Sequence, residues 1–350
     1  MIRAAPDLFD AFYYIRITID QTWAGGLRGR RLEQCLSGAN GRKGGGSLRR
    51  AGWFVVAAGR RKEGHADMEA FIFPGQGSQY RGMGGEWFEH DEFRRLESEI
   101  DQILGYSIRT LCLEDRDDRL RQTQFTQPAL YVVNALHYFR AVRENGLPSY
   151  VAGHSLGEFN ALFASGVFDF HTGLRLVKKR GELMGQARGG AMAAVIGPDA
   201  ETLAGLIEDH ALSTIDIANH NSPSQTIISG PEPDIEAAET ALKPHVDMFI
   251  PLPVSAAFHS RYMQDAADAF RLALADFSFG EPRVGVMSNV TAQPYPAENG
   301  SAAIKDLLVR QITSPVRWQD TVRHLRRLGV TEFREVGPGN VLTKLVAQVH

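Results

Sequence analysis

The 350-residue sequence predicts an α/β fold of two domains, one inserted into the other. Two short apolar runs, 69–73 and 150–153, each lead into a glycine-containing turn, as buried strands of an α/β sheet do. Between 191 and 259 the pattern changes to short strands and helices in the order β-α-β-β-α-β, which is typical of a small ferredoxin-like domain. A hydrophobic content of 43% is ordinary for a chain with a sizeable core.

The composition excludes several classes of protein. A net charge of −3 gives no indication of nucleic-acid binding. Two cysteines, Cys35 and Cys112, are too few for a disulfide scaffold or a cysteine metal site. No apolar run approaches the roughly 20 residues of a membrane-spanning helix. We therefore expect a cytoplasmic protein in a reducing compartment.

Residues 1–67 differ from the rest of the chain. They carry 12 Lys and Arg against 6 Asp and Glu, a net charge of +6, whereas the remainder carries −9. The segment is rich in glycine and arginine, and it lacks the apolar core and cleavage site of a secretory signal. We interpret it as an extension that is disordered or that results from an upstream start, with Met68 as the natural first residue. A flexible tail, a basic docking arm and a transit-like segment are the alternatives.

The domain boundaries follow from the change of pattern at 191 and 259. We assign 68–190 and 260–350 to the large domain and 191–259 to the insertion. In the large domain we predict strands at 69–73, 150–153, 283–287 and 332–336, and helices at 127–144, 156–165, 169–183 and from Asn340. In the insertion we predict strands at 191–196, 214–218, 225–229 and 248–254, and helices at 200–209 and 234–242.

A Gly-x-Ser-x-Gly motif occupies 153–157, between a predicted strand and a predicted helix. This is the context of a nucleophile elbow, a turn so tight that the flanking residues must be minimal. The turn presents the Ser155 hydroxyl above a helix N-terminus, where the partial positive charge and the Leu156 N–H can stabilise an anion. The motif predicts a nucleophilic serine, with a purely structural turn as the alternative.

A serine nucleophile needs a base, and the chain has 11 histidines. His154 adjoins the serine, but neighbours on such a turn point apart, so we expect it to be a packed residue. His137 and His171 fall within predicted helices and are expected on the surface or in the core. His259 lies at the exit of the last strand of the insertion, where the chain returns to the large domain. It is therefore the candidate that can reach the floor of a cleft.

Two further segments carry candidate functional residues. The loop at 74–79 follows the first strand, at the sheet edge where open α/β proteins bind ligands. It can complete an oxyanion hole with Leu156, and an ordinary connecting turn is the alternative. Arg180 follows Lys178 and Lys179 near the end of a predicted helix, and such a charge run is typically a solvated face.

Four motifs, in order, resemble those of the malonyl-CoA:acyl carrier protein transacylase family over residues 68–349. They are Phe-Pro-Gly-Gln-Gly-Ser-Gln at 73–79, Thr-Gln-Pro-Ala-Leu at 126–130, Gly-His-Ser-Leu-Gly-Glu at 153–158 and Glu-Val-Gly-Pro-Gly at 335–339. The resemblance implies an α/β-hydrolase-like large domain with a ferredoxin-like insertion. The segments 124–134 and 177–184 are most similar to the discrete, trans-acting acyltransferases of modular polyketide synthases, such as the disorazole synthase one.

The resemblance also implies roles for individual residues. Ser155 would be the nucleophile and His259 its base, oriented by the backbone carbonyl of Gln311 rather than by an acid. Arg180 would pair with the malonyl carboxylate, and Phe258 would crowd an α-methyl branch. The other implied positions are Gln76 and Leu156 at the oxyanion hole, and Asn219, Asn221 and Ser222 in a pocket-lining loop.

The implied reaction is transfer of malonyl from malonyl-CoA to the phosphopantetheine thiol of an acyl carrier protein, through a malonyl-serine. We expect no metal or other cofactor, no nucleic acid or membrane partner, and a monomer that meets a carrier protein or the carrier domains of a polyketide synthase. Three alternatives stay open. They are a transacylase of fatty acid synthesis, a hydrolase of acyl carrier proteins that uses the same Ser155 and His259, and a noncatalytic module that binds carrier protein.

Overall fold

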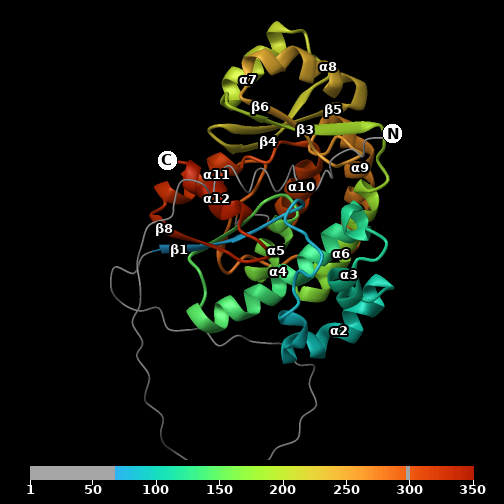
Figure 1. Ribbon diagram of the computed structural model, residues 1–350. Helices are drawn as coiled ribbons and strands as arrows, with labels where there is room; N and C mark the ends of the chain where they lie inside the picture. Colours follow the sequence, from blue (N-terminus) through green and yellow to red (C-terminus); the bar gives the residue numbers. More distant parts are fainter. Residues whose placement is uncertain (1–67, 297–299) are drawn as a thin grey trace, which may run out of the picture. The chain divides into compact units, whose positions relative to one another are not determined.

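The computed structural model describes residues 68–296 and 300–350. The extension that we assigned to 1–67 lies outside the described residues. The described chain contains a four-stranded parallel sheet and a four-stranded antiparallel sheet, both surrounded by helices (Figure 1). This arrangement confirms the predicted α/β class.

The parallel sheet has the strand order β7-β2-β1-β8. Its strands are β1 (Met68–Phe73), β2 (Tyr150–Gly153), β7 (Gly285–Val286) and β8 (Val330–Glu335). Side chains alternate between its two faces, as strand geometry requires. Phe71 and Phe73 pack into the main core on one face, whereas Ala70 and Ile72 pack on the other with residues of the last two helices. The central strands β1 and β2 are buried on both faces and are largely apolar, whereas the edge strand β8 is mostly polar and exposed.

Helices cover both faces of the parallel sheet and carry the segments that lead to the site. They are α2 (Asp91–Leu104), α3 (Ile108–Glu114), α4 (Thr123–Asn145), α5 (Gly157–Ala164), α6 (Phe170–Met184), α9 (Gln264–Ala273), α10 (Gly300–Thr313), α11 (Trp318–Arg327) and α12 (Val341–Gln348). α6 begins at an N-cap aspartate, Asp169, whose side chain accepts a hydrogen bond from the Thr172 N–H at 2.7 Å. That cap fixes the start of the helix on which Arg180 lies.

The antiparallel sheet has the strand order β4-β5-β3-β6. In sequence its elements are β3 (Gly190–Ile196), α7 (Ala200–Asp209), β4 (Asp216–Ser222), β5 (Gln225–Pro231), α8 (Glu232–Leu242) and β6 (Met248–Pro251). Both helices lie on one face of this sheet (Figure 1), where they form a small separate core with residues such as Ala193 and Val195. The opposite face contributes Met192 and Ala194 to the main core. The order of elements agrees with the predicted β-α-β-β-α-β.

Two predicted segments are wrong in ways that matter for the site. β6 ends at Pro251, earlier than the strand predicted at 248–254, so His259 lies in the loop before α9 and not at a strand exit. The segment 219–222, expected in a loop, belongs to β4. β4 pairs antiparallel with β5 as far as Ser222 and Gln225, so only a tight turn separates them. Asparagine and serine favour loops by composition, but hairpin pairing overrides that preference here.

Candidate active site

The turn between β2 and α5 holds Ser155 where three backbone segments touch. Ser155 has a φ of 51°, in the left-handed region that residues other than glycine seldom adopt. A Cβ on Gly153 would lie 1.9 Å from the backbone of Gly157, and one on Gly157 would lie 2.0 Å from the Phe73 carbonyl oxygen. A Cβ on Gly75 would lie 2.2 Å from the carbonyl oxygen of the residue before Ser155. Glycine is therefore required on both sides of the serine and in the facing loop.

Ser155 and His259 meet although they are far apart in sequence. His259 Nε2 lies 2.7 Å from Ser155 Oγ, and Nδ1 lies 2.8 Å from the main-chain oxygen of Gln311. Because a carbonyl oxygen only accepts, Nδ1 carries the proton and Nε2 can accept the serine proton. Burial, together with the positive charge of Arg180, lowers the pKa of His259 to about 3. The ring is therefore neutral, as a general base must be.

Arg180 is completely buried, which corrects the interpretation of the charge run at 178–180 as a solvated face. On α6 it lies one turn beyond the buried Leu176 and Val177, so it shares their inward stripe. Its Nη2 donates to Ser155 Oγ at 3.3 Å and to Gln311 Oε1 at 2.9 Å. Its Nε and Nη1 have no partner within the described residues. Burial lowers the pKa of Arg180 to about 10, which leaves the guanidinium charged at neutral pH with donors available for an anion.

Gln311 contacts the nucleophile, the base and the guanidinium at once. Its carbonyl accepts from His259, as the family resemblance implied. Its side-chain Nε2 donates to the Ser155 carbonyl oxygen at 2.9 Å and also to the Glu158 carboxylate, while Oε1 accepts from Arg180. The side chain thus does more than the sequence suggested.

The two residues predicted at the oxyanion hole, Leu156 and Gln76, have different hydrogen-bonding surroundings. Leu156 is buried at the N-terminus of α5, and no acceptor for its N–H occurs among the described residues. The loop after β1 passes close by, since a Cβ on Gly75 would lie 3.6 Å from the Leu156 nitrogen. The Gln76 amide instead donates to Thr123 Oγ1 at 3.4 Å, at the start of α4.

The three β4 residues predicted near the site divide into two groups. Asn221 Oδ1 lies 2.8 Å from His154 Nε2, and Asn219 Nδ2 lies 3.3 Å from the same nitrogen. Ser222 instead donates to the side chain of Gln348 on α12. His154 is therefore held by the antiparallel sheet, apart from the Ser155–His259 pair, and burial lowers its pKa.

Phe258 immediately precedes the base and is only 7% exposed. It belongs to the main core cluster, together with Leu156 and Phe159. Its backbone adjoins that of the base, and its ring is packed in this core.

Sequence reasoning missed Asn289, which bridges the two sides of the nucleophile. Its Oδ1 accepts from the Ser155 N–H at 2.7 Å, and its Nδ2 donates to the Gly153 carbonyl oxygen at 2.6 Å. It follows β7, the neighbour of β2 in the parallel sheet. Polar residues just after adjacent parallel strands gather at one sheet edge, so its place after the apolar run at 284–287 was a usable signal. Glu158, quoted above only as part of a motif, also contacts this network.

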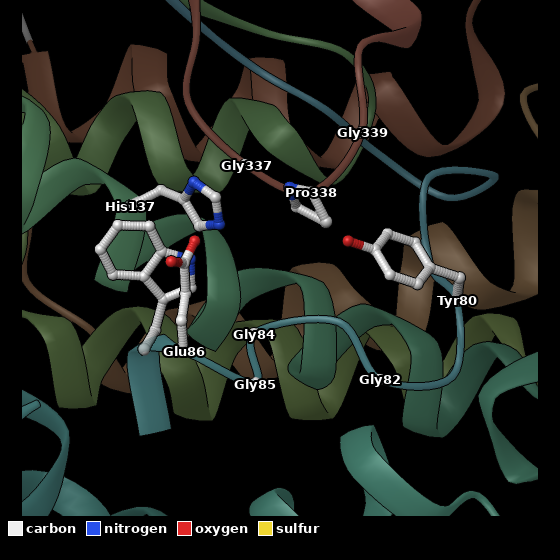
Figure 2. Close-up of a pocket in the computed structure, with 10 residues that line it drawn as sticks. Tyr80, Gly82, Gly84, Gly85, Glu86, His137, Gly337, Pro338 and Gly339 are labelled. Atoms are coloured by element: carbon white, nitrogen blue, oxygen red, sulfur yellow. The ribbon is translucent and has the colours of Figure 1, made fainter. Parts of the chain in front are cut away.

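A separate pocket lies between the loops that follow β1 and β8 (Figure 2). Tyr80 stands on one side of the Gly337–Pro338–Gly339 segment, and His137 and Glu86 stand on the other. None of the ten residues that line it was predicted at the site. Burial lowers the pKa of His137 to about 4.

Two further findings on the described chain concern membranes and metal ions. None of its helices combines the length and apolar character needed to cross a membrane. Within 68–296 and 300–350, no three His, Cys, Asp or Glu side chains gather as they would around a metal ion.

Comparison with known proteins places this geometry in a family. The sequence pattern of the acyl transferase domain matches residues 70–349. A polyketide biosynthesis malonyl CoA-acyl carrier protein transacylase of Bacillus velezensis is 51% identical over 285 residues, 81% of this chain and 96% of the relative. The crystal structure of a malonyl CoA-acyl carrier protein transacylase from Burkholderia pseudomallei has a TM-score of 0.77 and 47% identity, covering 81% of this chain and 98% of that one. A malonyl-transacylase solved in complex with its type II polyketide synthase acyl-carrier protein has a TM-score of 0.75 and 36% identity, covering 81% and 93%. The chain belongs to the acyl transferase domain family.

Proposed function

We propose that this enzyme transfers malonyl from malonyl-CoA to the phosphopantetheine thiol of an acyl carrier protein. The observation that carries the proposal is the position of Arg180. A buried guanidinium suits an acyl group that ends in a carboxylate when it lies 3.3 Å from the Ser155 hydroxyl oxygen and two of its nitrogen atoms have no partner among the described residues. The names of the three relatives described above agree with this chemistry.

In the first half-reaction, His259 Nε2 takes the proton of Ser155 as Oγ attacks the thioester carbonyl carbon. The negative charge develops on the carbonyl oxygen, which we place at the unpartnered Leu156 N–H with a second donor from the loop of Gln76. One such donor typically contributes about 10²–10³ in rate. Collapse of the tetrahedral intermediate breaks the carbon–sulfur bond, and the imidazolium returns the proton to the sulfur of coenzyme A. A malonyl ester of Ser155 remains.

In the second half-reaction, the carrier thiol gives its proton to His259 and attacks the ester. The serine oxygen leaves and recovers a proton from the imidazolium. We propose that no metal or other cofactor takes part, because the dyad handles every proton and the guanidinium holds the charge. Ping-pong kinetics are expected for such a covalent intermediate.

We propose a role in trans for a polyketide synthase. The identity of 51% to a polyketide-biosynthesis transacylase supports this over a role in fatty acid synthesis. A hydrolase that clears varied acyl groups would share Ser155 and His259, but a buried cation at the acyl site disfavours uncharged chains.

The finer description of the fold is also a proposal. The parallel sheet with its elbow supports an α/β-hydrolase-like domain formed by 68–190 and 260–350. The β-α-β-β-α-β order and the antiparallel sheet support a ferredoxin-like insertion at 191–259.

The proposed function is tested by incubating the purified protein with a panel of acyl-CoAs and measuring the mass added at Ser155. We expect a malonyl adduct that transfers to a phosphopantetheinylated carrier protein, and no adduct in Ser155→Ala. Labelling that survives in Ser155→Ala would remove this serine as the nucleophile. Loading that prefers acetyl-CoA over malonyl-CoA would contradict the substrate.

A further inference from the structure

Glu158 is a completely buried carboxylate on α5, one turn after the nucleophile. Tyr295 Oη donates to its Oε1 at 2.5 Å, and the Asn289 backbone N–H donates to the same oxygen at 3.2 Å. The Gln311 side-chain Nε2 donates to its Oε2. Both carboxylate oxygens are therefore bound by groups that surround the elbow.

Burying a carboxylate is costly, so its presence among these groups requires a physical explanation. Burial raises the pKa of Glu158 to about 7, while its hydrogen bonds and the positive charge of Arg180 act in the opposite direction. The nearby guanidinium is the group that holds substrate in the proposed function. Glu158 and Arg180 do not contact one another directly, and Gln311 lies between them.

The Gln311 amide has a polarity that its neighbours must match. A carboxylate oxygen only accepts and a guanidinium only donates, so Nε2 must face Glu158 and Oε1 must face Arg180. The reverse orientation would place Oε1 against the carboxylate and Nε2 against the guanidinium, with repulsion at both ends. Glu158, together with the Ser155 carbonyl oxygen that also accepts from Nε2, therefore determines which end of the amide Arg180 meets.

We propose that Glu158 is a positioning residue for the substrate clamp. Its carboxylate fixes the Gln311 amide, which holds the Arg180 guanidinium so that Nε and Nη1 remain free for the malonyl carboxylate. This inference rests on the proposed function and adds a residue that contacts neither the substrate nor the reacting atoms.

The first test is Glu158→Gln. The new amide meets donors on both sides, from Gln311 and from Asn289 and Tyr295, so one contact becomes donor against donor in either orientation. We expect the KM for malonyl-CoA to rise by about 10- to 100-fold, the range for loss of a hydrogen bond to a charged group. The KM for acetyl-CoA, which has no carboxylate, should change by less than about threefold, as should the labelling of Ser155 by a neutral fluorophosphonate.

Glu335→Gln is the matched control. The Glu335 carboxylate is half-buried and accepts from the N–H groups of Leu342 and Thr343 at the start of α12. This variant loses a hydrogen-bonded carboxylate without touching Gln311, so its preference for malonyl-CoA should equal that of the wild type.

The second test asks whether Glu158 acts through Gln311. Gln311→Met removes the amide and keeps the carbonyl that binds His259. In that background Glu158→Gln should cause no further loss of malonyl preference, since the relay is already broken. In the double variant the amide introduced at position 158 no longer faces the Gln311 amide, so the clash between two donors is absent. The role of Glu158 can therefore be tested even if the Glu158→Gln variant alone does not fold.

The outcomes separate this inference from the proposed function. A wild-type enzyme without preference for malonyl-CoA defeats the proposed function itself. A wild-type preference that persists in Glu158→Gln overturns only the role of Glu158. Equal losses for malonyl-CoA, acetyl-CoA and the fluorophosphonate, or a full additional loss in the double variant, would likewise overturn it.

Discussion

Ser155 and His259 both adopt left-handed backbone conformations, with φ values of 51° and 59°, and their side chains meet at 2.7 Å. Such conformations are costly for residues with a Cβ and persist where the surroundings fix them. Asn289 supplies part of that support at Ser155, and the carbonyl of Gln311 supplies it at His259. The reacting atoms are therefore in contact before any substrate arrives.

Arg180→Ala should lower kcat/KM for malonyl-CoA by at least about 100-fold, because a charge-assisted, bidentate contact is lost. Acetyl-CoA should be affected much less. Arg180→Lys keeps the charge but not the planar fork, so its malonyl activity should fall between those of the wild type and the alanine variant. The measurement is initial rates with both thioesters. Equal losses for the two would argue against a carboxylate clamp.

Phe258→Ala or Phe258→Ser should relax discrimination against methylmalonyl-CoA. Space for one methyl group is worth about 1–3 kcal/mol. The control is Phe279→Ala, which truncates another buried ring of the same core cluster. Both alanine variants should lose stability by roughly 3–5 kcal/mol, but only the first should change the ratio of kcat/KM values. An unchanged ratio in both would count against the steric explanation.

The pH dependence of Ser155 reactivity should reveal the lowered pKa of His259. A histidine accepts a proton only while neutral, so activity falls as pH drops through its pKa. Because burial and Arg180 lower that pKa from 6.5 to about 3, labelling by a neutral fluorophosphonate should stay constant well below pH 6.5. The neutral reagent avoids any contribution from the carboxylate clamp. A loss of labelling with a midpoint at or above pH 6.5 would contradict a buried, neutral His259.

Asn289→Ala should destabilise the fold and slow acylation together. It leaves the Ser155 N–H and the Gly153 carbonyl unpaired in a buried turn, at about 1–3 kcal/mol for each group. Displacement of the hydroxyl should reduce kcat by about tenfold or more. Chemical denaturation and single-turnover acylation measure the two effects. Asn145→Ala, which removes one partly buried hydrogen bond at the end of α4, should change neither by much.

The elbow was predictable from the sequence because its constraint is local. A strand, a Gly-x-Ser-x-Gly turn and a helix occur within 150–165, and the structure has them there. α7 was predicted to the residue, since its cap and periodicity lie within one short segment. His259 could only be suggested from its place at a domain boundary, because the loop that carries it folds by long-range packing.

The burial of Arg180 was not predicted from the charge run, because the three adjacent charged residues were interpreted together. The run at 178–180 suggested solvent, but helical spacing places Arg180 on the stripe of Leu176 and Val177. Asn289 and Glu158 were harder to find, because their contacts join segments separated by more than 130 residues. The position of Asn289 after a strand could indicate its sheet edge, but not its contact with Ser155.

The glycines at 75, 153 and 157 set a limit on how this enzyme can be diversified. Each occupies a place where a single methyl group would overlap main-chain atoms of another segment, and main chain cannot swing aside as a side chain can. A mutant library designed to accept new acyl groups should therefore leave these three glycines unchanged. Variation at 180 and 258 would instead change the proposed contacts to the acyl group, at a cost in malonyl activity or in stability.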